Sequence, residues 1–355
     1  MSCPPAHDLR RTLEECADFD EIIDVRSPAE FTEDHIPGAL NCPVLDDRER
    51  HEVGLLYAQS PFEARKLGAA MVARNIAAML ETHFRNRPKN WRPFIYCWRG
   101  GMRSQSTAQW FNMIGWRAGQ LIDGYKAWRR HVLAALTALP ASFQWRVVCG
   151  ATGSAKTRLL AALAARGEQT LDLEALAAHK GSVLGGLPNR AQPTQKWFET
   201  CLVELLERFD PARVIYVEAE SRKIGVCALP NALVAAMRTA PCIEIRATLT
   251  ARLAYLLKDY AYLGDNPVTL AASLSRLAGF IDNATLDRWQ CWARERNLPA
   301  LFRELIVRHY DPLYARSQYR HYERLVDARQ LPTDDLSEEA IGGLAEEVLR
   351  AGEDR

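Results

Sequence analysis

A cysteine stands in this sequence where a buried strand is expected to meet a loop rich in glycine and arginine. Cys97 ends the apolar run at 93–97, and a helix is predicted for 104–114. The loop between them consists of Trp98, Arg99, Gly100, Gly101, Met102 and Arg103. Backbone N–H groups, the positive end of the helix and the two arginines all favour the thiolate, the nucleophilic form of cysteine. The pattern predicts a reactive Cys97 in an anion-binding loop; the alternative is a thiol buried only for packing.

The spacing of Cys97 and Arg103, C-x5-R, is also that of cysteine-dependent phosphatases and arsenate reductases. A loop of this length suits a tetrahedral anion that resembles phosphate. Tyr96 stands where tyrosine phosphatases usually carry histidine, which argues against that activity. A cysteine-dependent phosphatase therefore stays open as an alternative for this part of the chain.

A second anion-binding loop follows the predicted strand 146–149 and precedes a helix predicted at 156–166. Its sequence, GATGSAKT, matches the Walker A pattern except that Ala155 replaces the last glycine. Backbone amides would hold phosphate, a lysine would neutralise it and a threonine hydroxyl would reach Mg²⁺. The expected phosphate contacts are Gly150, Thr152, Gly153, Ser154, Lys156 and Thr157. A Cβ at Ala155 is expected to crowd the backbone or hinder the approach of phosphate. The loop pattern still predicts phosphate binding, but it leaves ATP or GTP binding and hydrolysis open.

Two carboxylates follow the strand predicted at 213–218, where P-loop proteins hold a metal ion. Glu218 and Glu220 could serve in that way, or they could form an ordinary solvated strand end. No metal site follows with certainty from this pattern.

Strands and helices alternate in both halves of the chain, which is typical of parallel α/β domains. The first half has strands predicted at 21–25, 38–44, 93–97 and 119–123, and helices at 55–81, 104–114 and 125–136. The second half has strands predicted at 146–149, 170–173, 213–218 and 241–247. Everything after Thr248 is expected to be helical and rich in arginine and aromatic residues, with a terminal helix that begins at Ser337. The predicted domains are 1–136 and 145–355, with a linker at 137–144.

The composition excludes several classes of protein. The chain has 355 residues, of which 48% are hydrophobic and 25% charged, as in ordinary globular proteins. Because 45 Lys and Arg balance 44 Asp and Glu, any surface for nucleic acid must be a local patch. The stretch 82–131, basic and rich in tryptophan, is the candidate. No signal peptide and no membrane span are expected, and nine scattered cysteines without a CxxC pair predict reduced thiols in the cytoplasm.

Three segments of the first half resemble a rhodanese, or sulfurtransferase, domain. They are DVRSPAEF at 24–31, HIPGA at 35–39 and GYKAW at 124–128. The resemblance covers residues 20–131 and implies that Cys97 carries sulfur or selenium as a persulfide or perselenide.

A rhodanese-like domain followed by a P-loop domain resembles the tRNA 2-selenouridine synthase family. The matching strings are YCWRGGMRS at 96–104, DLE at 172–174, HKGS at 179–182, QPTQ at 192–195, EAESRKIG at 218–225 and YDP at 310–312. The resemblance implies a reaction on 2-thiouridine at the wobble position of tRNA. Its sulfur is geranylated with geranyl diphosphate, and selenium from selenophosphate then replaces that sulfur to give 2-selenouridine. The resemblance implies tRNA and an enzyme supplying selenophosphate as partners.

The resemblance also implies roles for particular residues. Cys97 and its loop would hold selenophosphate or a perselenide, and the P-loop would hold a nucleotide or the diphosphate of geranyl diphosphate. The possible acidic or substrate-binding residues are Asp172, Glu174, Glu218 and Glu220. Lys180 and Arg222 are possible contacts for tRNA or diphosphate phosphates, or ordinary polar loop residues. Other functions left open are a plain sulfurtransferase fused to a nucleotide-binding domain and a non-catalytic scaffold with two anion sites.

Overall fold

A computed structural model describes residues 9–353, with side chains described for 9–316 and 320–350. Cys3 and the N-terminal residues that bear on a signal peptide lie outside this range. The chain divides into two compact units, one made of residues 1–135 with 199–204 and the other of 136–198 with 205–355. Residues 137–144, the predicted linker, hold the end of helix α5, a short 3₁₀ helix and the first residue of a strand.

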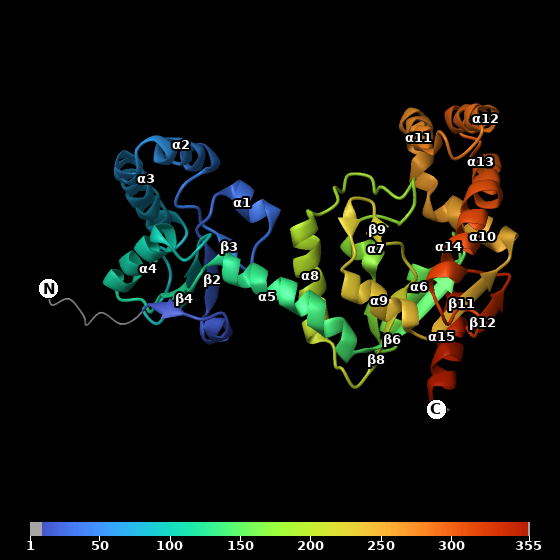
Figure 1. The fold of residues 1–355 in the computed structure, drawn as a ribbon, viewed down its shortest axis with the longest axis horizontal. Coiled ribbons are helices and arrows are strands. Elements are labelled where there is room, and N and C mark those ends of the chain that lie inside the picture. Colours follow the sequence, from blue (N-terminus) through green and yellow to red (C-terminus); the bar gives the residue numbers. More distant parts are fainter. Residues whose placement is uncertain (1–8, 354–355) are drawn as a thin grey trace. The chain divides into compact units, whose positions relative to one another are not determined.

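The first unit contains a five-stranded parallel sheet in the order β1-β5-β4-β2-β3 (Figure 1). The strands are β1 Arg10–Arg11, β2 Glu21–Asp24, β3 Leu40–Asn41, β4 Pro93–Tyr96 and β5 Gly119–Leu121. All four residues of the middle strand β4 are buried, as the apolar run at 93–97 predicts. This sheet confirms the predicted parallel α/β fold of the first half.

The helices of this unit are more numerous than the sequence predicts. They are η1 Glu14–Asp18, α1 Pro28–Glu33, α2 Asp47–Gln59, α3 Pro61–Thr82, α4 Met102–Ile114 and α5 Tyr125–Ala138. The region 55–81 is helical, as predicted, but Ser60 and Pro61 divide it between α2 and α3. Proline has no N–H to continue the hydrogen bonds of a helix, but it is favoured at the first position of a new one.

The second unit contains another five-stranded parallel sheet, in the order β12-β11-β6-β8-β7. The strands are β6 Gln144–Gly150, β7 Gln169–Leu171, β8 Val214–Glu218, β11 Cys242–Ala247 and β12 Arg329–Thr333. A separate antiparallel ribbon pairs β9 Lys223–Ile224 with β10 Cys227–Ala228. The prediction that only helices follow Thr248 is wrong, since β12 pairs with β11 over five residues.

Helices of the second unit flank this sheet and then form a helical extension. The first group is η2 Leu139–Ser142, α6 Lys156–Ala164, α7 Leu173–Leu176, α8 Gln195–Arg208 and α9 Asn231–Thr239. The extension consists of α10 Leu249–Asp259, η3 Ala261–Asp265, α11 Pro267–Leu274, η4 Ser275–Leu277, α12 Asn283–Arg294, α13 Leu298–Leu305, the π-helical turn η5 Ile306–Tyr310 and α14 Asp311–His321. The last helix, α15 Glu338–Glu353, begins directly after Ser337, as predicted.

A buried ion pair joins the end of β2 to its surroundings in the first unit. The Arg26 guanidinium donates to both carboxylate oxygens of Asp24, to Oδ2 at 2.6 Å and to Oδ1 at 3.1 Å, and to the Asp34 carbonyl at 2.6 Å. The guanidinium also lies 4.1 Å from the centre of the Tyr125 ring. Both charged side chains are almost fully buried, at 1% and 0% exposure. Removing one partner would leave the other charge buried without compensation.

We expect Arg26→Met to weaken the first unit by about 3–5 kcal/mol, because Asp24 would keep a buried charge without its partner. Hydrogen exchange of the amides in β2 and β4 measures this loss. Arg74→Ala is the matched control, because Arg74 also pairs with a carboxylate, Glu49, but its side chain is 67% exposed. That change should cost less than about 1 kcal/mol. Equal protection of β2 in the two variants would contradict the prediction.

Candidate functional site

Cys97 follows the middle strand of the first sheet and lies in the loop between β4 and α4. Gly101 is the N-cap of α4, so the loop leads directly into the first turn of this helix. The backbone N–H groups of residues 99–104 donate no hydrogen bond to any backbone carbonyl among the described residues. Unpaired N–H groups at a helix N-terminus form an anion-binding concavity. The loop thus has the backbone arrangement that the sequence predicts.

Cys97 is buried, at 3% exposure, and polar neighbours contact its sulfur. Ser104 Oγ donates to Sγ at 3.1 Å, and Gln120 Nε2 donates in turn to Ser104 Oγ at 3.0 Å. Gln120 lies on β5, and its amide also donates to the Gly100 carbonyl at 2.7 Å. Sequence reasoning missed Gln120, since nothing near it in the chain marks it as part of the loop.

Gly124 allows the close approach of another segment to this loop. It has a φ of +54°, and a Cβ at this position would lie 2.1 Å from the Cys97 carbonyl oxygen. A backbone atom cannot move away as a flexible side chain can. The glycine of the GYKAW string is therefore required by packing against Cys97.

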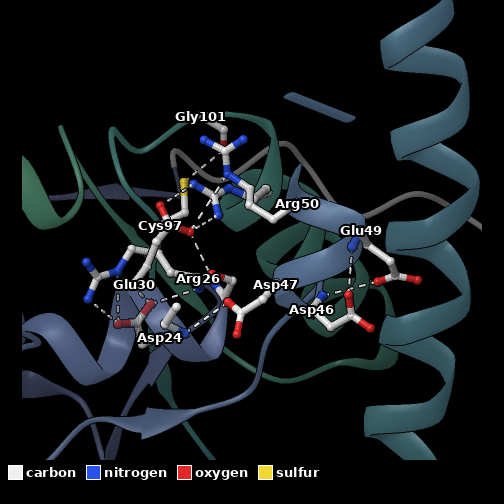
Figure 2. A network of polar contacts seen from close by, with 12 residues as sticks. Asp24, Arg26, Glu30, Asp46, Asp47, Glu49, Arg50, Cys97 and Gly101 are labelled. Carbon is white, nitrogen blue, oxygen red and sulfur yellow. Dashed lines mark hydrogen bonds and ion pairs between the residues drawn. The ribbon is translucent and has the colours of Figure 1, made fainter. Parts of the chain in front are cut away.

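Arginines from the loop and from α2 line a cavity beside Cys97, and Figure 2 shows Arg50 next to Cys97. A cavity of about 480 Å³ is lined by Arg50, Cys97, Trp98, Arg99, Gly101, Met102 and Arg103. Arg103 donates to Glu30 at 2.7 Å, and Arg50 lies 3.9 Å from the same carboxylate. Burial alone would raise the pKa of Glu30, but the hydrogen bond and charge of Arg103 lower it overall. Arg50 was missed by sequence reasoning, because it joins the loop only through the packing of α2.

The P-loop follows β6, the middle strand of the second sheet. Lys156 Nζ donates to the Gly150 carbonyl at 3.1 Å, so the lysine lies across its own loop. Gly153 has a φ of +82°, and a Cβ there would lie 2.8 Å from Leu256. Ser154 is buried, and its Oγ finds no hydrogen-bond partner among the described residues.

Ala155 takes the conformation that a glycine would normally adopt in this loop. Its φ is +59°, in the left-handed region that costs an alanine about 1–2 kcal/mol. The residue is 4% exposed and belongs to the core cluster that includes Val148 and Leu159. It also lines a cavity over the P-loop, called the phosphate cavity below. The loop thus keeps its path despite the missing glycine.

A cavity of about 480 Å³ opens over the P-loop. Among the predicted residues, Thr152, Gly153, Ser154, Lys156, Thr157, Asp172, Glu174, Lys180 and Glu220 line it. Gly150, Glu218 and Arg222 do not line it. Sequence reasoning missed Tyr255 and Tyr260, which enter this cavity from α10 and the turn after it.

Carboxylates crowd one side of the phosphate cavity. Thr157 Oγ1 donates to Glu174 Oε2 at 3.2 Å, and the Glu174 N–H donates to Glu218 Oε1 at 2.9 Å. Burial first, and then the charge of Glu220, raise the pKa of Glu174 to about 8. Burial likewise raises the pKa of Glu220 and, most strongly, of Glu218, which is fully buried. Glu218 therefore accepts a hydrogen bond from the first turn of α7 and does not line the cavity.

The HKGS string supplies a glycine between these carboxylates. Gly181 has a φ of +63°, and a Cβ there would lie 2.8 Å from Glu174 Oε1 and 2.9 Å from Glu220 Oε1. Lys180 next to it donates to Asp259 Oδ2 at 2.7 Å and lies 4.4 Å from the centre of the Tyr260 ring. Lys180 thus borders the cavity while it is paired with Asp259.

Other predicted strings have structural contacts instead. Gln192 Nε2 donates to the carbonyls of Ala177 and Ile224, each at 3.0 Å, so it fixes the β9–β10 ribbon. Gln195 bonds both backbone groups of Ala228 on the same ribbon. Arg222 donates to Asn231 at 2.8 Å and lies outside the phosphate cavity. The structure therefore does not bring Arg222 to the predicted diphosphate site.

The basic stretch 82–131 is less charged at its surface than its composition indicates. Carboxylates pair with Arg87, Arg92, Arg103, Arg129 and Arg130. Trp91 and Trp128 are core side chains at 4% and 7% exposure, whereas Trp110 is 45% exposed. Most of this segment thus serves the fold of the first unit.

The described residues contain neither a preformed metal-binding cluster nor a membrane-spanning helix. No group of three or more His, Cys, Asp or Glu side chains within them is arranged to hold a metal ion. No helix in the described range is long and apolar enough to cross a membrane.

Comparisons with known proteins agree with this two-part architecture. Residues 5–131 match the rhodanese-like domain family, and residues 143–273 match the family described as the tRNA 2-selenouridine synthase AAA domain. The tRNA 2-selenouridine synthase of Cupriavidus necator is 34% identical over 86% of this chain and 90% of its own length. Those of Aeromonas salmonicida and Marinobacter nauticus are 32% and 38% identical, over 86% and 67% of this chain and 89% and 65% of their own lengths. With two anion-binding loops and relatives alike over nearly its whole length, the chain belongs to the tRNA 2-selenouridine synthase family.

Proposed function

We propose that this protein converts 2-thiouridine at the wobble position of tRNA into 2-selenouridine. The observation that supports this proposal is the presence of two separate anion-binding loops, each after the middle strand of its own sheet, in a chain of this family. The reaction needs two anionic co-substrates, geranyl diphosphate and selenophosphate. Each loop is suited to one of them.

In the first step, the sulfur of thiouridine attacks C1 of geranyl diphosphate. A C–S bond forms, the C1–O bond breaks, and pyrophosphate leaves with the electron pair. The loop 150–157 would bind the diphosphate, and Lys156 would neutralise the charge that develops on the leaving group. Left-handed Ala155 does not conflict with this role, because a loop that binds diphosphate need not support hydrolysis.

In the second step, selenium attacks C2 of the base and the geranyl thiolate leaves, which then takes up a proton. Water cleaves the selenium–phosphorus bond, so that phosphate is released. The Cys97 loop would hold the selenium as selenophosphate, with the Cys97 thiol lining the same cavity. Arg50, Arg99 and Arg103 line the same cavity and would face the anion. Alkylation of the sulfur in the first step makes it the better leaving group here.

Mg²⁺ belongs to this proposal as a cation at the P-loop. The Thr157 hydroxyl and the Glu174 carboxylate would hold it, a small donor set that fits an ion which keeps several waters and phosphate oxygens as ligands. Its charge would relieve the repulsion between Glu174 and Glu220. The partners in this proposal are thiolated tRNA and an enzyme that supplies selenophosphate.

A cysteine-dependent phosphatase is the second candidate, on the C-x5-R spacing of Cys97 and Arg103. Tyr96 weakens that alternative, because it stands where tyrosine phosphatases usually carry histidine. Release of a chromophore from a phosphomonoester in the absence of tRNA would support the phosphatase.

We expect variants of the two loops to stop the reaction at different points. Cys97→Ser should accumulate geranylated nucleoside without selenouridine, because the first step does not use the thiol. Lys156→Ala should slow geranylation roughly 100- to 1,000-fold, the usual effect of removing one group that stabilises a developing anion. Mass spectrometry of nucleosides from thiolated tRNA, incubated with both co-substrates, measures the two products.

Matched controls are Cys291→Ser and Lys258→Ala, since Cys291 is an exposed thiol and Lys258 an exposed lysine outside the cavity. Both should behave as the wild type. Selenouridine formed at the normal rate by Cys97→Ser would refute the role of the thiol, and geranylation that survives Lys156→Ala would refute the role of the P-loop.

The raised pKa of Glu174 predicts that pyrophosphate binding depends on pH in a chelator buffer. The carboxyl is protonated below its pKa of about 8 and charged above it, so it repels the anion only at high pH. Affinity should therefore fall as pH rises through about 8, by up to about tenfold per unit for one linked proton.

Glu174→Gln should bind pyrophosphate with nearly constant affinity over the same range, as measured by isothermal titration calorimetry. Glu168→Gln is the control, because Glu168 is a carboxylate of the same unit outside the cavity. If the affinity of Glu174→Gln for pyrophosphate still falls steeply as the pH rises, another group is responsible for the pH dependence.

A further inference from the structure

An apolar pocket adjoins the phosphate cavity in the second unit. The two spaces share Thr152, Ser182, Leu256, Tyr260 and Tyr310 along their common wall. Beyond this wall the described residues that line the pocket are Leu184, Phe302, Leu305 and Ile306. A ligand whose phosphates lie on the P-loop would therefore meet an apolar space at its other end.

The pocket walls come from the helical extension. Leu256 belongs to α10, Phe302 and Leu305 to α13, and Ile306 and Tyr310 to the π-helical turn η5. A π turn widens a helix by one residue and is frequent at functional sites. All these residues are part of, or packed against, one hydrophobic cluster that also contains Trp289. The apolar end of the site is thus a built part of the core.

A buried arginine ties this wall to the P-loop. Arg252 on α10 is 6% exposed, and its Nε donates to the Thr152 carbonyl at 2.9 Å. Its two other nitrogens donate to the Asp311 carboxylate at 2.5 and 3.1 Å, directly after the π turn. Sequence reasoning missed Arg252. These contacts fix the position of the apolar wall relative to the P-loop.

Three polar side chains of the shared wall already interact with one another. The hydroxyls of both Tyr260 and Tyr310 interact with Ser182. A nucleobase buried here would find few partners for its own donors and acceptors, and an unpaired polar group in an apolar pocket is costly. An apolar chain has no such requirement.

We propose that this pocket binds the tail of a diphosphate ester with a short apolar chain, while the P-loop binds its diphosphate. This inference rests on the proposed function, in which geranyl diphosphate is that ester. The whole pocket, shared wall included, holds only about 20 Å³ of free space, so it admits no more than the end of a short chain. The rest of the chain would lie along Leu256, Tyr260 and Tyr310. Leu305 and Phe302 are the residues that contact the chain end.

The test compares the binding of geranyl diphosphate and inorganic pyrophosphate by isothermal titration calorimetry, with the full chain and Mg²⁺ in the buffer. Wild type should bind geranyl diphosphate at least about tenfold more tightly, because burial of the tail adds to the shared diphosphate contacts. Leu305→Ala should reduce this ratio roughly tenfold and leave the affinity for pyrophosphate unchanged.

Leu301→Ala is the matched control. Leu301 is also a buried leucine of α13 in the same cluster, but it does not line the pocket. It should leave the ratio at the wild-type value. Ile306→Val, which removes one methylene from the pocket wall, serves as a milder variant if Leu305→Ala does not fold, and it should lower the ratio by a smaller factor.

Each outcome decides between the two proposals. Equal affinity of wild type for the two ligands, or a ratio lowered equally by Leu305→Ala and Leu301→Ala, would overturn the tail pocket and leave the proposed function standing. Binding of neither ligand would overturn the diphosphate role of the P-loop itself. ATP that binds more tightly than geranyl diphosphate, and is weakened by Leu305→Ala, would overturn the inference by assigning the pocket to a nucleoside.

Discussion

The unpaired backbone N–H groups at the start of a helix determine where both candidate sites lie. A parallel strand cannot return by a tight turn, so each middle strand, β4 and β6, leads through a loop into a helix whose first N–H groups lack partners. Anions are favoured at such ends. The sulfur of Cys97 and the phosphate contacts of the P-loop thus occupy equivalent places in two sheets of the same kind. Everything else at either site adjusts the charge and the shape around these N–H groups.

The surroundings of the two loops differ in the charge that they add. The Cys97 loop faces arginines, of which Arg103 is balanced by Glu30. The P-loop instead faces carboxylates, and Glu174 keeps its proton up to a pH of about 8 because burial raises its pKa. Under the proposed function, the first arrangement would attract a compact anion to a thiol. The second would accept a larger anion when the carboxyl is protonated or a cation is present. Two sites with the same backbone origin can therefore hold different anions.

The sequence is sufficient to predict features that depend on neighbours in the chain. Both loops, the strands before them and the parallel α/β class follow from local patterns, and the structure confirms the fold class. Arg50, Gln120 and Arg252 could not be found in this way, since each reaches a loop from a distant element. Strand β12 was missed for another reason. Pro332 interrupts its pattern, which only an edge strand tolerates, and β12 is an edge strand.

Both anion sites are balanced internally before any ligand binds. Lys156 donates to a carbonyl of its own loop, Lys180 pairs with Asp259, and Arg103 pairs with Glu30. An incoming anion must replace these contacts, so the net gain from its charge is smaller than the number of cations indicates. Affinity must then come from several contacts made at once, by the N–H groups and by the rest of the ligand. A diphosphate ester with a tail in the apolar pocket satisfies this condition better than a free phosphate does, which favours a substrate over the phosphate ions of its surroundings.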